Sequence, residues 1–323
     1  MSETAASGRI PVAVIGCGVF GRHHARIYRQ SPRAELAGVY DTDPARAAAV
    51  AQEFETRAFA SLAEAAAAAR AATVAVPTAA HEAVALELFE RGLDLLVEKP
   101  IAPSLASADR MLAAAQRHGR LLMVGHLERY NPAVQLVRSR LTRPLFFEVH
   151  RLSVFTPRSL DVDVLLDLMI HDLDIVLSFT GSPIRDLQAV GLAVLSRHTD
   201  IANVRVTFAN GCVANLTASR VSTEKVRKLR VFQPGEYISL DYARRDARRF
   251  AVAPGGGPLG LGIEHEHLLG EDREPLAAEI AAFLEGVAER RQPEPDGNAA
   301  RAALAAALQA AEAISRHREA LAI

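Results

Sequence analysis

The segment IPVAVIGCGVFG, residues 10–21, joins an uninterrupted apolar run to a glycine-rich turn. The run is typical of a strand that is buried on both faces of a parallel sheet. The turn has the spacing G-x-G-x-x-G and precedes an amphipathic segment at 20–30. A strand before the glycines and a helix after them indicate a dinucleotide-binding turn, with a tight turn that holds no ligand as the alternative. The residues of this turn that we expect to contact the cofactor are Gly16, Gly18, Val19, Phe20 and Gly21.

An aspartate stands where such a turn requires an acid. Asp41 ends the second apolar run, 20 residues after Gly21. A carboxylate at this position accepts hydrogen bonds from a ribose 2′-hydroxyl. It would also repel a 2′-phosphate, so the sequence favours NAD over NADP. Arg22 and Arg46 lie nearby in the sequence and weaken this preference slightly.

Apolar runs alternate with amphipathic, Ala-rich stretches through the first third of the chain. The runs that we predict as strands are 10–16, 35–41, 73–77, 94–100 and 121–126, and the stretches that we predict as helices are 20–30, 43–54, 62–70, 79–91 and 104–118. This alternation predicts an α/β doubly wound parallel sheet of the Rossmann type. We assign it to residues 1–125.

The pattern changes after about residue 126. The predicted strands there are 146–153, 187–196, 202–208, 213–221, 226–232 and 237–243. Asn210-Gly211 is a strong hairpin signal between two of them. A helix is expected across 164–179, a turn-rich loop at 254–262, and final helices near 275–290 and 298–316. We therefore predict that residues 126–323 form an α/β domain with a mainly antiparallel sheet.

Composition excludes several classes of function. The 323 residues carry a net charge of −1, which does not favour nucleic acid or an anionic membrane as a partner. Two cysteines are too few for a disulfide framework or a four-cysteine zinc site, and we predict no metal site. The polar N-terminus lacks a secretory signal, and no apolar run approaches the about 18 residues that span a bilayer. These features predict a cytoplasmic protein.

The segment VLLDLMIHDLDIV, residues 164–176, places charged groups in an apolar stretch. In a helix, Asp167 and His171 are four residues apart and share a face. Asp172 would point away from that face, and Asp174 would be a secondary partner of the pair or a surface charge. The pair on its own is compatible with catalysis or with a polar seam between layers.

Three motifs join the glycine turn. Val76-Pro77-Thr78-Ala79-Ala80-His81 follows one strand, Glu98-Lys99-Pro100 ends another, and Asp167-x-x-x-His171 lies in the second domain. Together they resemble the Gfo/Idh/MocA family, named after glucose–fructose oxidoreductase, inositol dehydrogenase and rhizopine catabolism. The resemblance implies a Rossmann domain, an open-faced antiparallel sheet domain, and an active site between the two. It also implies hydride transfer between NAD(P) and a carbohydrate hydroxyl, and a homodimer or homotetramer built through the open sheet.

The first domain contributes Lys99 to the expected chemistry. It stands at the carboxyl end of a parallel strand, where an ammonium can stabilise charge on a sugar oxygen. A solvated strand-end lysine is the alternative. We expect Glu98 to contact the lysine or the cofactor. Pro77, Thr78 and His81 lie at another strand end, where Thr78 and His81 would contact the cofactor or cap the next helix.

The second domain contributes the residues that the family projects toward the nicotinamide. By resemblance, His171 is the candidate general base, since the ordinary pKa of histidine lies near neutrality. Asp167 would bind a substrate hydroxyl or orient the imidazole. Whether Lys99 or His171 accepts the proton stays open.

Two stretches narrow the substrate. GHLERYNP (125–132) and the run around 151–177 are similar to the branch that oxidises the 3-hydroxyl of nucleotide-linked amino sugars such as UDP-N-acetylglucosamine. Arg129, Asn131 and Arg158 would then bind the sugar or its diphosphate, with a salt bridge or a helix cap as the alternative. The competing functions are a dehydrogenase of a free sugar or inositol and a non-catalytic regulator that binds NAD and sugar.

Overall fold

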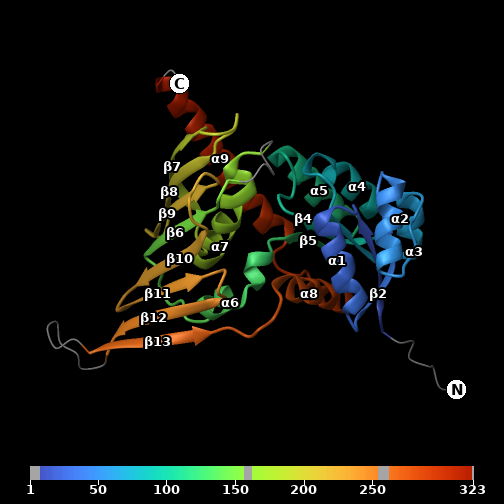
Figure 1. Cartoon of the computed structure of the whole chain (residues 1–323), viewed down its shortest axis with the longest axis horizontal. Helices are drawn as coiled ribbons and strands as arrows, with labels where there is room; N and C mark the ends of the chain where they lie inside the picture. Colours follow the sequence, from blue (N-terminus) through green and yellow to red (C-terminus); the bar gives the residue numbers. More distant parts are fainter. Residues whose placement is uncertain (1–7, 156–161, 254–261, 322–323) are drawn as a thin grey trace. The chain divides into compact units, whose positions relative to one another are not determined.

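The computed structural model describes residues 8–155, 162–253 and 262–321 (Figure 1). Its contacts divide the chain into two compact units. The first unit combines the chain up to Leu127 with Glu274–Arg301, and the second combines Glu128–Arg273 with the residues from Ala302 onward. Arg158, predicted to bind substrate, lies outside the described residues.

The first unit is built on a parallel sheet, as the sequence predicts. Its strands lie in the order β2-β1-β3-β4-β5, and every neighbouring pair is parallel. They are β1 (Ile10–Ile15), β2 (Ala34–Tyr40), β3 (Ala71–Val74), β4 (Asp94–Glu98) and β5 (Leu122–Gly125). The predicted third strand is displaced, because β3 begins at Ala71 and the chain has left the sheet before Pro77. Pro77 therefore lies in the loop after the strand.

Helices cover both faces of this sheet. Figure 1 shows α4 and α5 on one side and α1 and α8 on the other. The helices of the first unit are α1 (Val19–Gln30), α2 (Pro44–Glu53), α3 (Leu62–Ala68), α4 (His81–Glu90), α5 (Leu105–Arg117) and α8 (Pro275–Glu289). Local capping sets several starts: the Asp43 side chain accepts hydrogen bonds from Ala45 N and Arg46 N, and Ser61 accepts one from Glu64 N.

The segment Glu274–Arg301 belongs to the first unit, whereas the sequence predicted it in the second domain. Helix α8 packs beside α1. The Arg70 side chain donates to Val287 O at 2.7 Å, and Val124 N donates to Pro295 O at 3.0 Å. These contacts join residues far apart in the chain, so local sequence patterns did not indicate them.

The second unit contains an eight-stranded sheet within the described residues, in the order β13-β12-β11-β10-β6-β9-β8-β7. Neighbouring strands are antiparallel except for the parallel pair β6 and β9, which confirms the mainly antiparallel prediction. The strands are β6 (Phe146–Leu152), β7 (Ile184–Leu192), β8 (Ile201–Phe208), β9 (Val213–Ser219), β10 (Val226–Gln233), β11 (Glu236–Asp241), β12 (Asp246–Val252) and β13 (Ile263–Leu269). Strands β12 and β13 were not predicted, because their charged residues conceal the alternation of apolar and polar positions.

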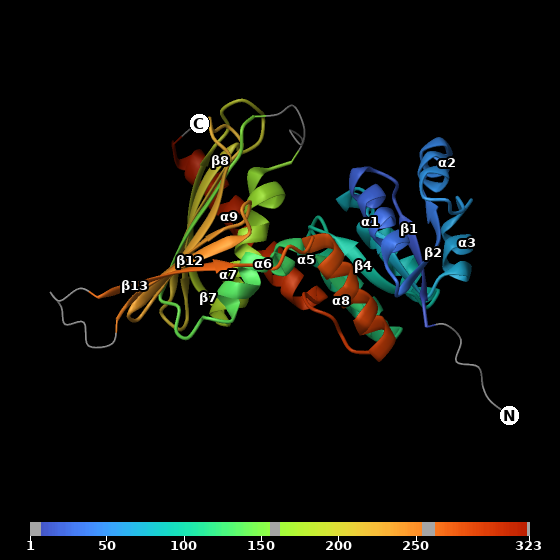
Figure 2. The same ribbon diagram turned by 60° about the horizontal axis from the view of Figure 1, so that its bottom comes forward.

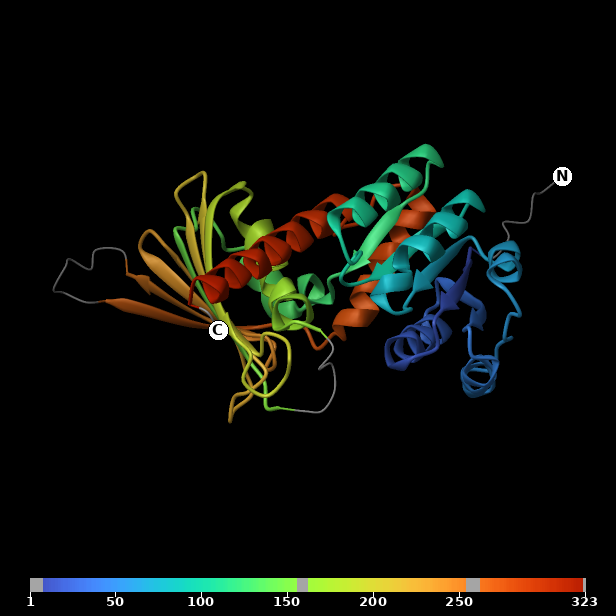
Figure 3. The same cartoon turned by 90° about the horizontal axis from the view of Figure 1, so that it is seen from above.

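Helices pack on one face of this sheet. Helix α6 (Pro132–Arg138), a π-helix (Leu165–Met169), α7 (Ile170–Thr180) and much of α9 (Gly297–Leu321) contribute to its apolar core. Figures 2 and 3 show α7 and α9 on the same side of the strands. The predicted end of the helix is confirmed, because Gly181 adopts φ +57° directly after Thr180. Among the described helices, none is both long and apolar enough to cross a membrane.

Candidate functional site

In the turn between β1 and α1, the space that a side chain would meet differs at each of the three glycines. Gly16 has φ +95°, and a Cβ there would lie 2.5 Å from Ala75 O. A Cβ on Gly21 would lie 1.7 Å from Gly16 O, so this glycine permits the close packing of helix on turn. Around Gly18, a Cβ would meet nothing within 4 Å. The first and third glycines thus shape the turn, and the second leaves open backbone at the start of a helix, where an anion binds well.

Asp41 connects the end of β2 to this turn. Its Oδ2 accepts a hydrogen bond from Cys17 N at 2.7 Å, and its Oδ1 accepts one from Asp43 N at 2.9 Å. Arg46 Nη1 lies 3.5 Å from Oδ2. Burial, with a contribution from the charge of Asp41, raises the pKa of the Cys17 thiol to about 12, so this side chain stays protonated at neutral pH.

A cavity of about 530 Å³ lies beside the turn. Its walls come from the ends of β1, β2 and β3 and from the start of α1. Val19 and Phe20 line it and are large apolar side chains with 67% and 50% of their surface exposed. Apolar walls around open backbone amides suit the adenosine and pyrophosphate of a dinucleotide. The predicted cofactor residues that line this cavity are Gly16, Gly18, Val19, Phe20, Asp41 and Pro77.

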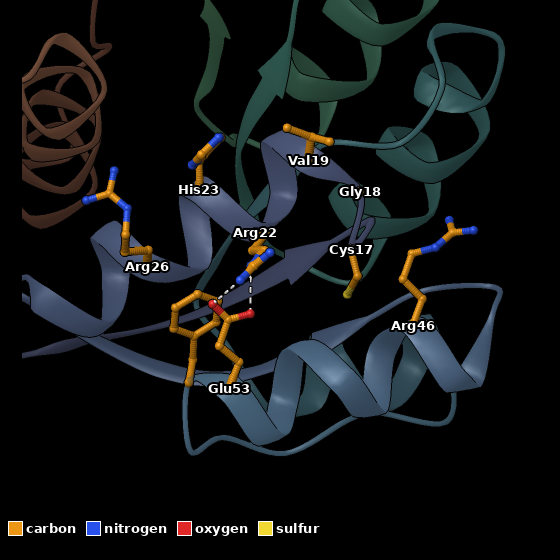
Figure 4. Close-up of a pocket in the computed structure, with 9 residues that line it drawn as sticks. Cys17, Gly18, Val19, Arg22, His23, Arg26, Arg46 and Glu53 are labelled. Atoms are coloured by element: carbon orange, nitrogen blue, oxygen red, sulfur yellow. Dashed lines mark hydrogen bonds and ion pairs between the residues drawn. The ribbon is translucent and has the colours of Figure 1, made fainter.

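Figure 4 shows a second pocket, of about 630 Å³, between α1 and α2. Three guanidinium groups surround it, and each one is paired with carboxylates. The pairs are Arg22 with Glu53, Arg26 with Glu274, and Arg46 with Asp41 and Asp43. Because this basic charge is already balanced, we place the cofactor in the first cavity, which shares Gly18, Val19 and Arg46 with this pocket.

Glu98 and Lys99 lie at the carboxyl end of β4. Glu98 is the last residue of the strand and is buried, with its Oε1 2.8 Å from His24 Nε2. Its Oε2 accepts a hydrogen bond from Lys99 N at 3.2 Å. Burial alone would raise the pKa of Glu98, but the hydrogen bond to His24 and the charge of Lys99 outweigh it and lower this pKa. The Glu98 carboxylate does not line the cavity, and its partner His24 was not predicted from the sequence.

His81 is the first residue of α4, and it bonds to the main chain instead of lining the cavity. Its Nδ1 lies 3.0 Å from Pro100 O, and its Nε2 lies 3.0 Å from Val76 O. The side chain is buried, which lowers the pKa of the imidazole. Each ring nitrogen therefore lies next to a carbonyl oxygen, one of which can accept the single N–H of the neutral ring, and His81 lies between the loop after β3 and the loop after β4. Thr78 lies in the 3₁₀ turn before it and does not line the cavity either.

In the second unit, the polar residues of 164–176 divide into two groups. Asp172 is buried and receives two hydrogen bonds from Arg151, at 2.7 and 2.8 Å. Asp174, which the sequence suggested as a secondary partner or a surface charge, is instead buried and paired with a guanidinium. Asp167 and His171 are only half-buried. Asp167 lies within the π-helix, a local widening that is frequent at functional sites.

Two residues predicted to bind substrate have structural contacts within the second unit. Arg129 donates to both carboxylate oxygens of Asp174 at 2.7 Å, and it is 8% exposed. Asn131 caps α6, because its Oδ1 accepts from Ala133 N, while its Nδ2 donates to Glu128 and to Tyr242 O. The structure thus supplies the salt bridge and the cap that the sequence left as the alternative.

Comparison with known proteins identifies the family. A model of the oxidoreductase family with an NAD-binding Rossmann fold matches residues 10–126, and a GFO/IDH/MocA C-terminal domain model matches residues 133–233. A UDP-N-acetylglucosamine 3-dehydrogenase from Acidithiobacillus ferrooxidans is 40% identical over 302 residues, covering 93% of this chain and 96% of that protein. The chain belongs to the Gfo/Idh/MocA oxidoreductase family.

Solved and curated members of the Gfo/Idh/MocA family extend this result. A structure of the UDP-N-acetylglucosamine 3-dehydrogenase from Acidithiobacillus ferrooxidans superimposes with a TM-score of 0.90 at 40% identity, covering 95% of this chain and 97% of that one. A myo-inositol dehydrogenase from Streptomyces leeuwenhoekii is 34% identical over 194 residues, or 57% of this chain and 59% of that protein. The protein is therefore a dehydrogenase with an NAD-binding Rossmann domain.

The structure groups the predicted family residues within each unit. The glycine turn, Asp41 and Pro77 surround one cavity, and Lys99 follows a neighbouring strand of the same sheet. Asp167 and His171 lie four residues apart in the second unit. The buried partner His24 was missed. Its sequence position, three residues after the last glycine of the turn, places it on α1 but does not reveal that it reaches β4.

Proposed function

We propose that this dehydrogenase uses NAD to oxidise the 3-hydroxyl of UDP-N-acetylglucosamine to a ketone. The observation that carries the proposal is the 40% identity to an enzyme named for this reaction, maintained over 93% of the chain. Inositol dehydrogenases match less of the chain, 55–67% of it, at 28–34% identity. Similarity that continues through the second unit favours the nucleotide sugar.

The glycine turn and Asp41 would hold the cofactor. Open backbone at Gly18 suits the pyrophosphate, and the Asp41 carboxylate suits a ribose diol better than a 2′-phosphate. This acid is the reason for proposing NAD over NADP, although Arg46 lies beside it. When bound, the nicotinamide supplies the acceptor for the hydride.

Three side chains would act on the sugar. His171 takes the proton of the hydroxyl, a task that suits imidazole near neutral pH. Asp167 orients that imidazole or binds a neighbouring hydroxyl. The Lys99 ammonium stabilises the negative charge that develops on the oxygen as its proton leaves.

A substrate screen tests this proposal. Purified protein is mixed with NAD or NADP and with UDP-N-acetylglucosamine, free N-acetylglucosamine, UDP-glucose, glucose or myo-inositol, and reduced cofactor is followed by absorbance. We expect the highest kcat/KM for UDP-N-acetylglucosamine with NAD. Faster turnover of myo-inositol or a free sugar would instead support the alternative dehydrogenase, and no turnover of any compound would support a binding protein.

We also propose that the chain forms a homo-oligomer in the cytoplasm through the face of the second-unit sheet opposite the helices. A row of neighbouring rings, stacked in two pairs and tilted in the other two, crosses that face, with centroids 4.6–5.5 Å apart between neighbours. Its members are Phe146, Phe232, Tyr237, Phe250 and His265. Both cysteines are free and buried, which agrees with a reducing compartment.

A further inference from the structure

Two buried histidines of the first unit lie outside the cavity and yet contact the strand end that carries Lys99. His24 is fully buried and His81 is 1% exposed. Neither lines a cavity beside the glycine turn. His24 contacts the segment before Lys99, and His81 contacts the segment after it. Buried polar groups need partners, and both of these histidines have theirs at Glu98–Ile101.

The contacts of His24 form a chain of hydrogen bonds. Glu98 is a carboxylate with a lowered pKa, so it accepts a hydrogen and His24 Nε2 must donate it, at 2.8 Å. On the other side of the ring, His24 Nδ1 lies 3.3 Å from Thr73 Oγ1, which lies 2.8 Å from Tyr28 Oη. Tyr28 and Thr73 are fully buried. This chain fixes the orientation of the His24 ring.

The chain ends on the backbone of Lys99. Glu98 Oε1 accepts from His24, and Oε2 accepts from Lys99 N at 3.2 Å. On the neighbouring strand, a Cβ at Gly125 would lie 3.2 Å from the Glu98 carboxyl carbon, so the absence of a side chain there leaves space for the carboxylate. One carboxylate thereby joins α1 to the main chain of Lys99.

His81 holds the other side of the same segment. Its Nδ1 lies 3.0 Å from Pro100 O and 3.3 Å from Ile101 O, and its Nε2 lies 3.0 Å from Val76 O. With the hydrogen on Nδ1, His81 donates to the carbonyl of Pro100, the residue after Lys99, and its ring lies against the loop that follows β3, where Pro77 lines the cofactor cavity. Lys99 is fixed at its own amide and again at the next carbonyl.

We propose that His24 and His81 are positioning residues that hold the main chain of Lys99 in place for catalysis. The inference rests on the role proposed above for Lys99. A lysine side chain has four flexible bonds, so the direction of its ammonium depends on a fixed backbone. A catalytic group displaced by about 1 Å loses about 10²-fold in rate. Neither histidine needs to contact substrate or cofactor to have this effect.

The test compares matched substitutions at adjacent histidines. His24→Leu removes the hydrogen bond to Glu98, whereas His24→Gln keeps an N–H near the position of Nε2. His23→Leu is the control, because His23 is the next residue of α1 and is exposed. For each variant, kcat and KM are measured with the substrate that the screen identifies, and the NAD dissociation constant is measured by calorimetry.

We expect His24→Leu to lower kcat about tenfold or more with little change in KM or NAD affinity. His24→Gln recovers most of the lost turnover, and His23→Leu behaves as the wild type. At His81, Asn keeps a donor near the position of Nδ1, so His81→Asn retains more turnover than His81→Leu. If His24→Leu does not fold, the comparison of His81→Asn with His81→Leu tests the positioning role.

Two results would overturn the inference. One is wild-type kcat in both leucine variants. The other is an equal loss of turnover in the Gln and Leu variants, which would indicate only a packing role. Lys99→Ala is assayed beside them: if it keeps full activity, the proposed role of Lys99 fails, whereas an inactive Lys99→Ala with active His24→Leu and His81→Leu refutes the positioning role alone.

Discussion

Charged residues in the apolar segment 164–176 do two different things. Asp172 and Asp174 are buried and paired with Arg151 and Arg129, which lie 21 and 45 residues away in the sequence. Asp167 and His171 are only half-buried, and they are the pair that we propose acts on the substrate. Helical spacing predicted the second pair, because i and i+4 residues share a face. It could not assign partners to the first pair, because these come from other elements.

At the residue scale, substitution of the proposed catalytic groups should lower turnover without weakening the binding of NAD. We expect Lys99→Ala and His171→Ala each to lower kcat by about 10²–10⁴-fold, because each removes a group that handles charge or a proton in the transition state. NAD affinity, measured by calorimetry, stays near that of the wild type. Lys225→Ala, at an exposed lysine, is the control and keeps full activity. An equal loss of NAD binding in both active-site variants would indicate structural roles instead.

At the scale of an element, the structure separates the roles of Gly18 and Gly21, which the G-x-G-x-x-G motif treats alike. A methyl group on Gly18 enters open space, whereas one on Gly21 collides with Gly16 O. We expect Gly18→Ala to leave the melting temperature unchanged and to weaken NAD binding about tenfold or more, since its methyl group obstructs the close approach of the pyrophosphate. Gly21→Ala lowers the melting temperature itself. Wild-type NAD affinity in Gly18→Ala would contradict this assignment.

The contribution of the loop between β7 and β8 to the stability of the fold should depend on pH through the carboxylate of Asp200. Asp200 accepts hydrogen bonds from Val194 N, Leu195 N and Ser196 N at 2.6–2.8 Å. Burial alone would raise the pKa of Asp200, but these bonds and the Ser196 hydroxyl lower it to about 2, from 3.8. A lowered folded-state pKa stabilises the fold above the unfolded-state pKa, and that stabilisation disappears as pH falls through the folded-state value.

Comparison with Asp200→Asn isolates this effect. The charge of Asp200 contributes about 2 kcal/mol to the free energy of unfolding above pH 4, since one pKa unit corresponds to about 1.4 kcal/mol. We expect the stability gap between wild type and variant to narrow as pH falls from about 4 toward 2. Urea unfolding at a series of pH values measures the gap, with exposed Asp186→Asn as the control. A gap that does not depend on pH would refute this explanation.

Strands were predicted correctly where the sequence has a continuous apolar run. They were missed where apolar and polar residues do not alternate regularly. The continuous apolar runs of β1 and β4 are buried along nearly their whole length and were placed within two residues of their ends. Strand β12 and the edge strand β13 carry Arg248, Arg249 and His265-Glu266-His267, and polar residues occur on both of their faces. Their apolar period is therefore too weak to detect in the sequence.

At the scale of the whole molecule, the sequence predicted two domains but not the path of the chain between them. The return of Glu274–Arg301 to the first unit depends on contacts such as Arg70 with Val287 O, which join residues 217 positions apart. The cavity beside the glycine turn was predictable because a short motif forms it. The buried contacts of His24 were not predictable, since they require the packing of α1 on β4.

The aromatic row, whose rings are half-buried except for exposed His265, gives a prediction about assembly. Tyr237 is central to it, with its ring 4.6 Å from that of Phe250 and 5.4 Å from that of Phe232. If this face joins copies of the chain, a charge there must be buried at the interface without a partner, at a large cost. We expect light scattering to show an oligomer for the wild type and smaller species for Tyr237→Arg. Unchanged assembly in the variant would exclude this face.

The most direct test of the proposed reaction follows one hydrogen atom. UDP-N-acetylglucosamine that carries deuterium at C3 is incubated with the enzyme and NAD, and the reduced cofactor is analysed by mass spectrometry. We predict that the deuterium appears in NADH and that turnover is slower than with the unlabelled sugar, because breaking the C3–H bond is part of the reaction. NADH that forms without the label, while the sugar keeps its deuterium, would contradict oxidation at the 3-position.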